Sequence, residues 1–135
     1  KGLILPTEPP SHEHNYYNFT CRIDSEILGW KGPPAQLREM IMKALQAEGT
    51  QVGVWQQFIL PAMTVFQAKN AFGKNSPWCF GAPVDYSPSR FPVAQKHTDS
   101  HFGMTMPLRA PNGAEQAKRV AEGIRKVFEN VGQLF

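Results

Sequence analysis

The sequence predicts an α+β fold, in which a small mixed or antiparallel sheet carries helices packed on one face. An early segment alternates apolar and polar residues with the period of a strand, and two later segments carry apolar residues at helical spacing. The chain has 135 residues, of which 41% are hydrophobic, and this length suits one domain with one core.

The first predicted strand covers residues 15–24, where side chains alternate between two faces. The residues expected to point inward are Tyr17, Phe19, Cys21 and Ile23; those expected to point outward are Tyr16, Asn18, Thr20 and Arg22. Because Cys21 falls on the inward face, we expect a buried thiol there rather than a disulfide with Cys79.

A helix is predicted from Pro33–Pro34 to about Glu48, since prolines suit a first helical turn. Its apolar stripe consists of Leu37, Met40, Ile41, Ala44 and Leu45. Gly49 is expected to end the helix in the left-handed conformation. A short strand over 51–55 is predicted next, with Val52 and Val54 on one side.

Residues 56–90 are rich in aromatic residues, glycine and proline. They predict a brief helix over Ala62–Asn70 within an otherwise ordered loop. Long aromatic loops in small domains are commonly functional or lie against a partner.

The last third predicts a helix over Pro92–His101, a third strand over Gly103–Pro107 and a final helix from about Ala114 to Val131. Asn112 with Glu115 suggests a capping box at the start of that helix, and Gly132 suggests its end. Its predicted buried face consists of Ala117, Val120, Ala121, Ile124, Val127, Phe128 and Val131.

Charge and motifs exclude several function classes. The net charge of +3 is scattered along the chain, whereas nucleic-acid surfaces gather cations on one face, so no nucleic-acid partner is predicted. No signal peptide and no long apolar run is present, which favours a cytoplasmic protein without membrane contact.

The sequence supplies no catalytic, cofactor-binding or metal-binding residue of its own. His97 and His101 have a helical ligand spacing, but the acidic partner of a zinc-protease motif is missing, so no metal site is predicted. Nucleophile motifs and glycine-rich phosphate loops are also absent.

Four segments together carry a resemblance to a known family: His14-Asn-Tyr-Tyr17, Arg38 through Gly49, Phe91-Pro-Val-Ala94 and Met104-Thr-Met-Pro-Leu108. From about His14 to Phe128 the chain resembles the C-terminal small domain of a DegT-type aminotransferase. These are fold type I pyridoxal-phosphate (PLP) enzymes known from amino-sugar and aminocyclitol biosynthesis. The chain departs from the family after residue 54, where Trp55 to Pro61 replace a His-Tyr-Pro-like segment and a Pro-Leu-His.

The resemblance implies that residues 1–13 are an extended, proline-rich lead-in from a missing large domain and that 14–135 form the small domain. It further implies that the large domain holds most of the PLP site, including the Schiff-base lysine, and that this segment alone is inactive. No Ser-x-x-Lys or Thr-x-x-Lys occurs here. The implied substrates are a keto-sugar or cyclitol and an amino-acid donor, and the implied assembly is a homodimer.

Within this interpretation the candidate substrate-binding residues are Trp55, Gln56, Gln57 and Phe58. An aromatic ring beside two amides suits a neutral polyhydroxylated substrate. The alternative is that Trp55 belongs to the core and the glutamines to the surface. The enzyme interpretation also predicts exposed apolar surface on Phe58, Phe66 and Trp78. A lysine-free sugar dehydratase of the same family, or a non-catalytic binding or regulatory module, remains open.

Overall fold

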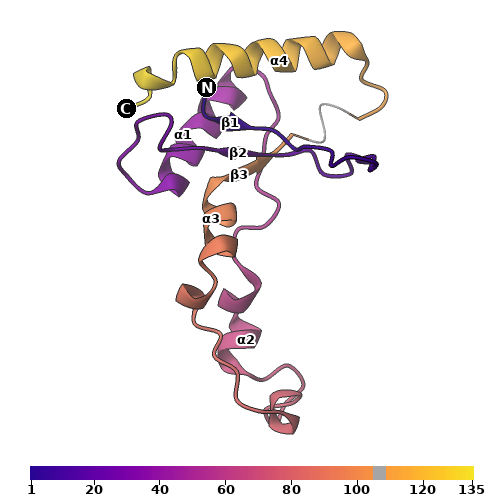
Figure 1. Ribbon diagram of the computed structural model, residues 1–135, viewed down its shortest axis with the longest axis vertical. Coiled ribbons are helices and arrows are strands. Elements are labelled where there is room, and N and C mark those ends of the chain that lie inside the picture. Colours follow the sequence, from indigo (N-terminus) through magenta and orange to yellow (C-terminus); the bar gives the residue numbers. More distant parts are fainter. Residues whose placement is uncertain (105–108) are drawn as a thin grey trace. The chain divides into compact units, whose positions relative to one another are not determined.

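The computed structural model describes residues 1–104 and 109–135 (Figure 1). The chain divides into two compact units. The first unit comprises Lys1–Trp55 and Asp99–Phe135, and the second comprises Gln56–Thr98.

The first unit contains a three-stranded antiparallel sheet. Its strands are β1 (Leu3–Ile4), β2 (Thr20–Ile23) and β3 (His101–Gly103), in the order β1-β2-β3 (Figure 1). Leu3 pairs with Ile23, and Cys21 pairs with Phe102. Residues 3–4 of the proline-rich lead-in are therefore the edge strand of this sheet.

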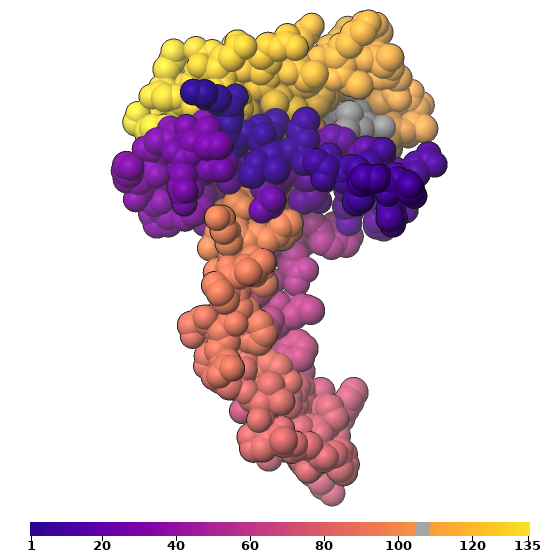
Figure 2. Space-filling view, viewed as in Figure 1, coloured from indigo at the N-terminus to yellow at the C-terminus, as the bar shows by residue number. Residues whose placement is uncertain are grey.

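Two helices complete the core on one face of the sheet, which confirms the predicted α+β class. They are α1 (Pro34–Ala47) and α4 (Ala114–Glu129), followed by a 3₁₀ turn at Val131–Gln133. The most deeply buried side chains of the shared core are Cys21, Leu37, Ile41, Leu45 and Phe102. Figure 2 shows the surface of this unit, with residues near the N-terminus in indigo and α4 in orange to yellow.

Strand β2 is shorter than predicted because the chain turns before it. Tyr16 has a φ of 49°. The backbone N–H groups of Tyr16 and Tyr17 donate to His14 Nδ1 at 2.7 Å and to Asn15 Oδ1 at 3.0 Å. Such local hydrogen bonds from side chains compete with the backbone hydrogen bonds of a β-sheet. The inward prediction was wrong for Tyr17, whose exposed fraction is 62%, whereas it is confirmed for the buried Cys21 and Ile23.

Helix α1 ends as predicted. Gly49 has a φ of 81° and donates to Gln46 O at 3.0 Å, while Thr50 N donates to Leu45 O at 2.9 Å. These two bonds make a Schellman motif. The predicted strand 51–55 is reduced to one isolated bridge between Gly53 and Gly103, and Val52 and Val54, which were predicted to lie on one side, both pack against the core.

Helix α4 corrects several predicted details. Gly113 precedes its first turn with no side-chain cap, so the capping box on Asn112 was wrong. The helix ends at Glu129, and Gly132 lies in the following 3₁₀ turn instead of stopping it. Its buried face includes Gly123, whereas Ala117 and Ala121 are exposed.

The third strand begins two residues earlier in the structure than the sequence predicts. The observed strand β3 begins at His101, and residues 105–107 of the prediction lie outside the described residues. The preceding helix, α3 (Pro92–Ser100), is present as predicted and begins in the second unit.

The second unit consists of short helices and ordered loop. Its first helix, α2 (Thr64–Ala68), confirms the brief helix predicted there and ends at Lys69, whose φ is 50°. Short 3₁₀ turns occur at Leu60–Ala62, Trp78–Phe80 and Pro88–Arg90.

An aromatic cluster of Phe66, Trp78 and Tyr86 organises the second unit. The Phe66 ring centroid lies 5.9 Å from that of Trp78 and 5.3 Å from that of Tyr86. Trp78 Nε1 donates to the Tyr86 hydroxyl at 3.1 Å. Phe66 and Trp78 are half-buried by this packing, so the prediction that they are exposed was wrong, whereas Phe58 is exposed as predicted.

Within the described part of the chain, no helix combines the length and the apolar character needed to cross a membrane.

Candidate ligand-binding pocket

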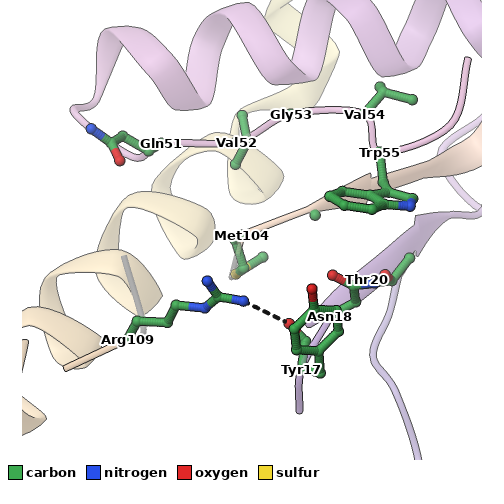
Figure 3. A pocket seen from close by; sticks show the side chains of 11 residues that line it. Tyr17, Asn18, Thr20, Gln51, Val52, Gly53, Val54, Trp55, Met104 and Arg109 are labelled. Atoms are coloured by element: carbon green, nitrogen blue, oxygen red, sulfur yellow. Dashed lines mark hydrogen bonds between the residues drawn. The ribbon is translucent and has the colours of Figure 1, made fainter. Parts of the chain in front are cut away.

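The first unit carries a pocket of about 370 Å³. Its aromatic residues are Tyr17 and Trp55, its polar side chains are Asn18, Thr20, Gln51 and Arg109, and its apolar side chains are Val52, Val54 and Met104 (Figure 3). Gly53 and Gly103 contribute backbone. The pocket therefore combines residues from the start of β2, from the segment after α1 and from the segment after β3.

The segment after α1 is fixed at three points. The Schellman turn sets its direction, and Gln46 Nε2 donates to Val52 O at 3.2 Å. Gly53 and Gly103 then exchange two backbone hydrogen bonds, with N–O distances of 3.0 and 2.7 Å. An extended segment alternates its side chains, so that Val54 packs on the core while the Trp55 indole stays 76% exposed.

The segment before β2 is held by hydrogen bonds near its start. His14 N donates to Glu8 Oε1 at 3.2 Å. The Tyr16 hydroxyl also donates to the Glu8 carboxylate, which lowers the pKa of Glu8 and raises the pKa of Tyr16. The turn that follows presents the exposed Tyr17 ring to the pocket.

Arg109 reaches toward Tyr17 from the opposite end of the sequence (Figure 3). Its guanidinium carbon lies 5.4 Å from the Tyr17 ring centroid, within the range of a cation–π contact. Its Nη2 is 3.5 Å from the Tyr17 carbonyl oxygen, which is a long hydrogen bond. Among the described residues that line the pocket, Arg109 is the only charged one.

The four predicted substrate-binding residues do not all line one described pocket. Trp55 lines the pocket of the first unit, and its exposure excludes the alternative that it is a core residue. Gln56 lines a different pocket in the second unit, while Gln57 and Phe58 line neither. A substrate role for all four residues stays a prediction.

Sequence reasoning missed Tyr17, Asn18, Thr20, Gln51 and Arg109 as pocket residues. A signal existed for Asn18 and Thr20, which the alternation placed on the face away from the core. No such signal existed for Arg109, because its position depends on a long-range approach to Tyr17.

The second unit has a wider pocket of about 750 Å³. Its lining is mostly apolar, from residues such as Leu60, Phe91 and Val93, with Arg90 and His97 at its polar part. Arg90 lies 3.6 Å from the Asp85 carboxylate, whose pKa is lowered chiefly by hydrogen bonds from Ser87. This lining offers apolar contact and few groups that could orient a polar ligand.

His97 and His101 do not keep the helical spacing that a shared metal would need. His97 lies in α3, whereas His101 is the buried first residue of β3. Among the described residues, no cluster of three histidine, cysteine or acidic side chains could hold a metal ion.

The pocket of the first unit does not by itself fit PLP. A Schiff base needs a lysine amine, and the ring nitrogen usually pairs with a carboxylate. The described residues that line the pocket include neither group. These side chains suit the binding of a polar organic ligand beside an aromatic face.

No protein-family model matches the chain, and the comparison with curated proteins found no match.

Proposed function

We propose that the chain is the substrate-binding small domain of a cytoplasmic, homodimeric PLP-dependent aminotransferase. The enzyme would transfer an amino group from an amino acid to the carbonyl of a keto-sugar or cyclitol. The observation that carries the proposal is the exposed Trp55 indole in a pocket that also holds Asn18, Thr20 and Gln51. The DegT-like segments of the sequence and the α+β fold agree with it.

An exposed tryptophan beside amides and a hydroxyl suits a sugar or cyclitol. Such molecules present C–H groups on one face of the ring, which pack on an indole, and hydroxyls around its edge. Asn18 and Gln51 can each donate and accept hydrogen bonds, and Thr20 can do both through one oxygen. These residues would orient the substrate by its hydroxyls and shield one face of it from water.

The cofactor would supply an electron sink when bound, and it would be held outside this pocket, because the lining residues do not fit it. The role proposed for this chain is therefore to bind and orient the carbonyl substrate. No proton-transfer step is assigned to the residues of the pocket.

An absorbance spectrum of the complete native protein, before and after borohydride, tests the proposal. A yellow band that reduction removes would support a lysine-bound PLP enzyme. A band lost on dialysis without a trapped adduct would instead favour the lysine-free dehydratase. A protein without any cofactor would overturn both.

A non-catalytic binding module is the second candidate. It is favoured by Phe72 and Phe80 in the second unit, each with an exposed fraction of 84%. In an enzyme with a further domain, we expect the loop that carries them to gain protection from hydrogen exchange in the complete protein. Equal protection in the isolated chain and the complete protein would favour the binding module.

A further inference from the structure

We propose that the pocket of the first unit recognises a carboxylate on its sugar ligand and that Arg109 is the residue that binds it. This inference deepens the proposed function, because it names the class of sugar as a sugar acid. It replaces the neutral substrate expected from the glutamines after Trp55.

The charge balance of the pocket favours an anionic ligand. Arg109 is the only charged side chain among the described lining residues, and no described acidic side chain forms an ion pair with it. A guanidinium has five N–H donors. The described residues accept one hydrogen bond from Arg109, at the long distance of 3.5 Å. Most of its donors are thus available to a ligand.

The guanidinium of Arg109 is already positioned in the pocket by Tyr17. Tyr17 holds it by a cation–π contact at 5.4 Å and by its carbonyl oxygen, so that part of the conformational freedom of a long side chain is already restricted. Trp55 lines the same pocket and offers a face for the sugar ring. A hexose whose ring lies on Trp55 and whose carboxylate meets Arg109 would use both features together.

The presence of a single cationic side chain among the described lining residues indicates which kind of anion the pocket binds. A planar guanidinium pairs with both oxygens of one carboxylate through two parallel hydrogen bonds. Phosphate dianions are generally bound by several donors, such as helix N-termini or more than one cation. A single arginine among amides and aromatic rings therefore favours a carboxylate over a phosphate.

The test is an NMR titration that follows the indole N–H of Trp55. Trp30 and Trp78 serve as internal controls, since their Nε1 atoms donate to Pro33 O and to the Tyr86 hydroxyl. The probes are D-glucuronate, D-glucose, glucose 6-phosphate and L-glutamate, the last of which carries a carboxylate on an amino acid.

We expect glucuronate to bind about tenfold more tightly than glucose, as a charge-assisted bidentate pair would give in an open pocket. Added salt should reduce this preference. Arg109→Gln should abolish the preference for glucuronate over glucose. Arg119→Gln, which removes an exposed arginine from α4, is the matched control and should keep the preference.

Four results would overturn the inference. They are an unchanged preference in Arg109→Gln, equal affinities for glucuronate and glucose, tighter binding of the sugar phosphate, and binding of L-glutamate without glucuronate. If neither sugar moves the Trp55 signal, the pocket also loses its place in the proposed function. A protein that binds glucuronate but contains no PLP would overturn the aminotransferase and leave this inference standing.

Discussion

Gly123 and Thr50 approach so closely that a Cβ added to Gly123 would stand 3.0 Å from Thr50 Oγ1. The contact joins the middle of α4 to Thr50, the last residue of the Schellman motif that ends α1. An ion pair reinforces it nearby, because Lys126 Nζ lies 2.8 Å from Glu48 Oε2. The absence of a side chain at Gly123 thus sets how near α4 lies to the end of α1.

Gly123→Leu should destabilise the chain, because a larger side chain must displace the buried Thr50. Overpacking of this kind lowers the free energy of unfolding by about 1–3 kcal/mol. Chemical denaturation measures the loss. Gly132→Ala is the control, since nothing lies within 4 Å of a Cβ at that position, and it should change stability little. Equal stability of the two variants would contradict the close approach.

Gly49→Ala should lower the free energy of unfolding by about 1 kcal/mol, because a Cβ is strained at the left-handed C′ position of a helix. The position has open space around it, so the effect would come from the backbone conformation and not from a clash. Thermal unfolding with the same Gly132→Ala control checks this. An unchanged melting temperature would argue against the Schellman motif.

The two cysteines should differ in reactivity. Cys79 is exposed, whereas Cys21 is fully buried, and burial raises the pKa of its thiol to about 12. A thiol reagent at neutral pH should label Cys79 at once and Cys21 only after unfolding. Rapid labelling of both thiols in the native protein would show that β2 is not in the core.

The raised pKa of the Cys21 thiol also predicts that the stability of the protein depends on pH. The folded state keeps the Cys21 thiol protonated, so its contribution is complete below the usual pKa of 9.0. It should be lost as the pH rises from there toward about 12. Denaturation curves of wild type and Cys21→Ala, recorded across this pH range, give the free energy of unfolding of each. The two free energies should converge as the pH rises, because only the wild type has the thiol. A constant difference between the two would contradict the shift.

Trp55→Ala should weaken sugar binding without lowering stability, because an indole that is 76% exposed contributes little to the core. A loss of about tenfold in affinity is expected for the removal of an aromatic stacking face. The control is Phe72→Ala, which removes an aromatic ring that is 84% exposed in the second unit. An equal loss in both variants would refute a specific role for Trp55.

Tyr86→Phe should loosen the second unit locally. The substitution removes the acceptor of the Trp78 Nε1–H bond and leaves a half-buried donor unpaired, which costs about 1 kcal/mol. Hydrogen exchange of residues 66–86 should accelerate, while exchange in β2 and β3 stays unchanged. Faster exchange throughout the chain would mean that the two units unfold together.

Helix α1, its glycine end and the inward Cys21 were predictable, because each follows from local spacing or from one special residue. The turn at Tyr16 was not, since its hydrogen bonds to the His14 ring and the Asn15 side chain compete with an alternation that predicts a longer strand. In α4, the buried face contains Gly123 and not the predicted Ala117 and Ala121. The sequence did not predict this, because the close approach of Gly123 to Thr50 depends on tertiary packing. Trp55 was already a candidate from the sequence and lines the pocket, whereas Arg109 joins it there through a contact with Tyr17, which lies far away in the sequence.

The bridge between Gly53 and Gly103 joins the two parts of the first unit. The residues between them that form the second unit are therefore an insertion into the first. The loop-closure entropy of such an insertion changes by only about 0.6 kcal/mol for each doubling of its length. The sheet, α1, α4 and the pocket around Trp55 should therefore tolerate large changes in the length and composition of residues 56–98. The ligand binding proposed for the first unit and any contacts made by the inserted segment could then evolve separately.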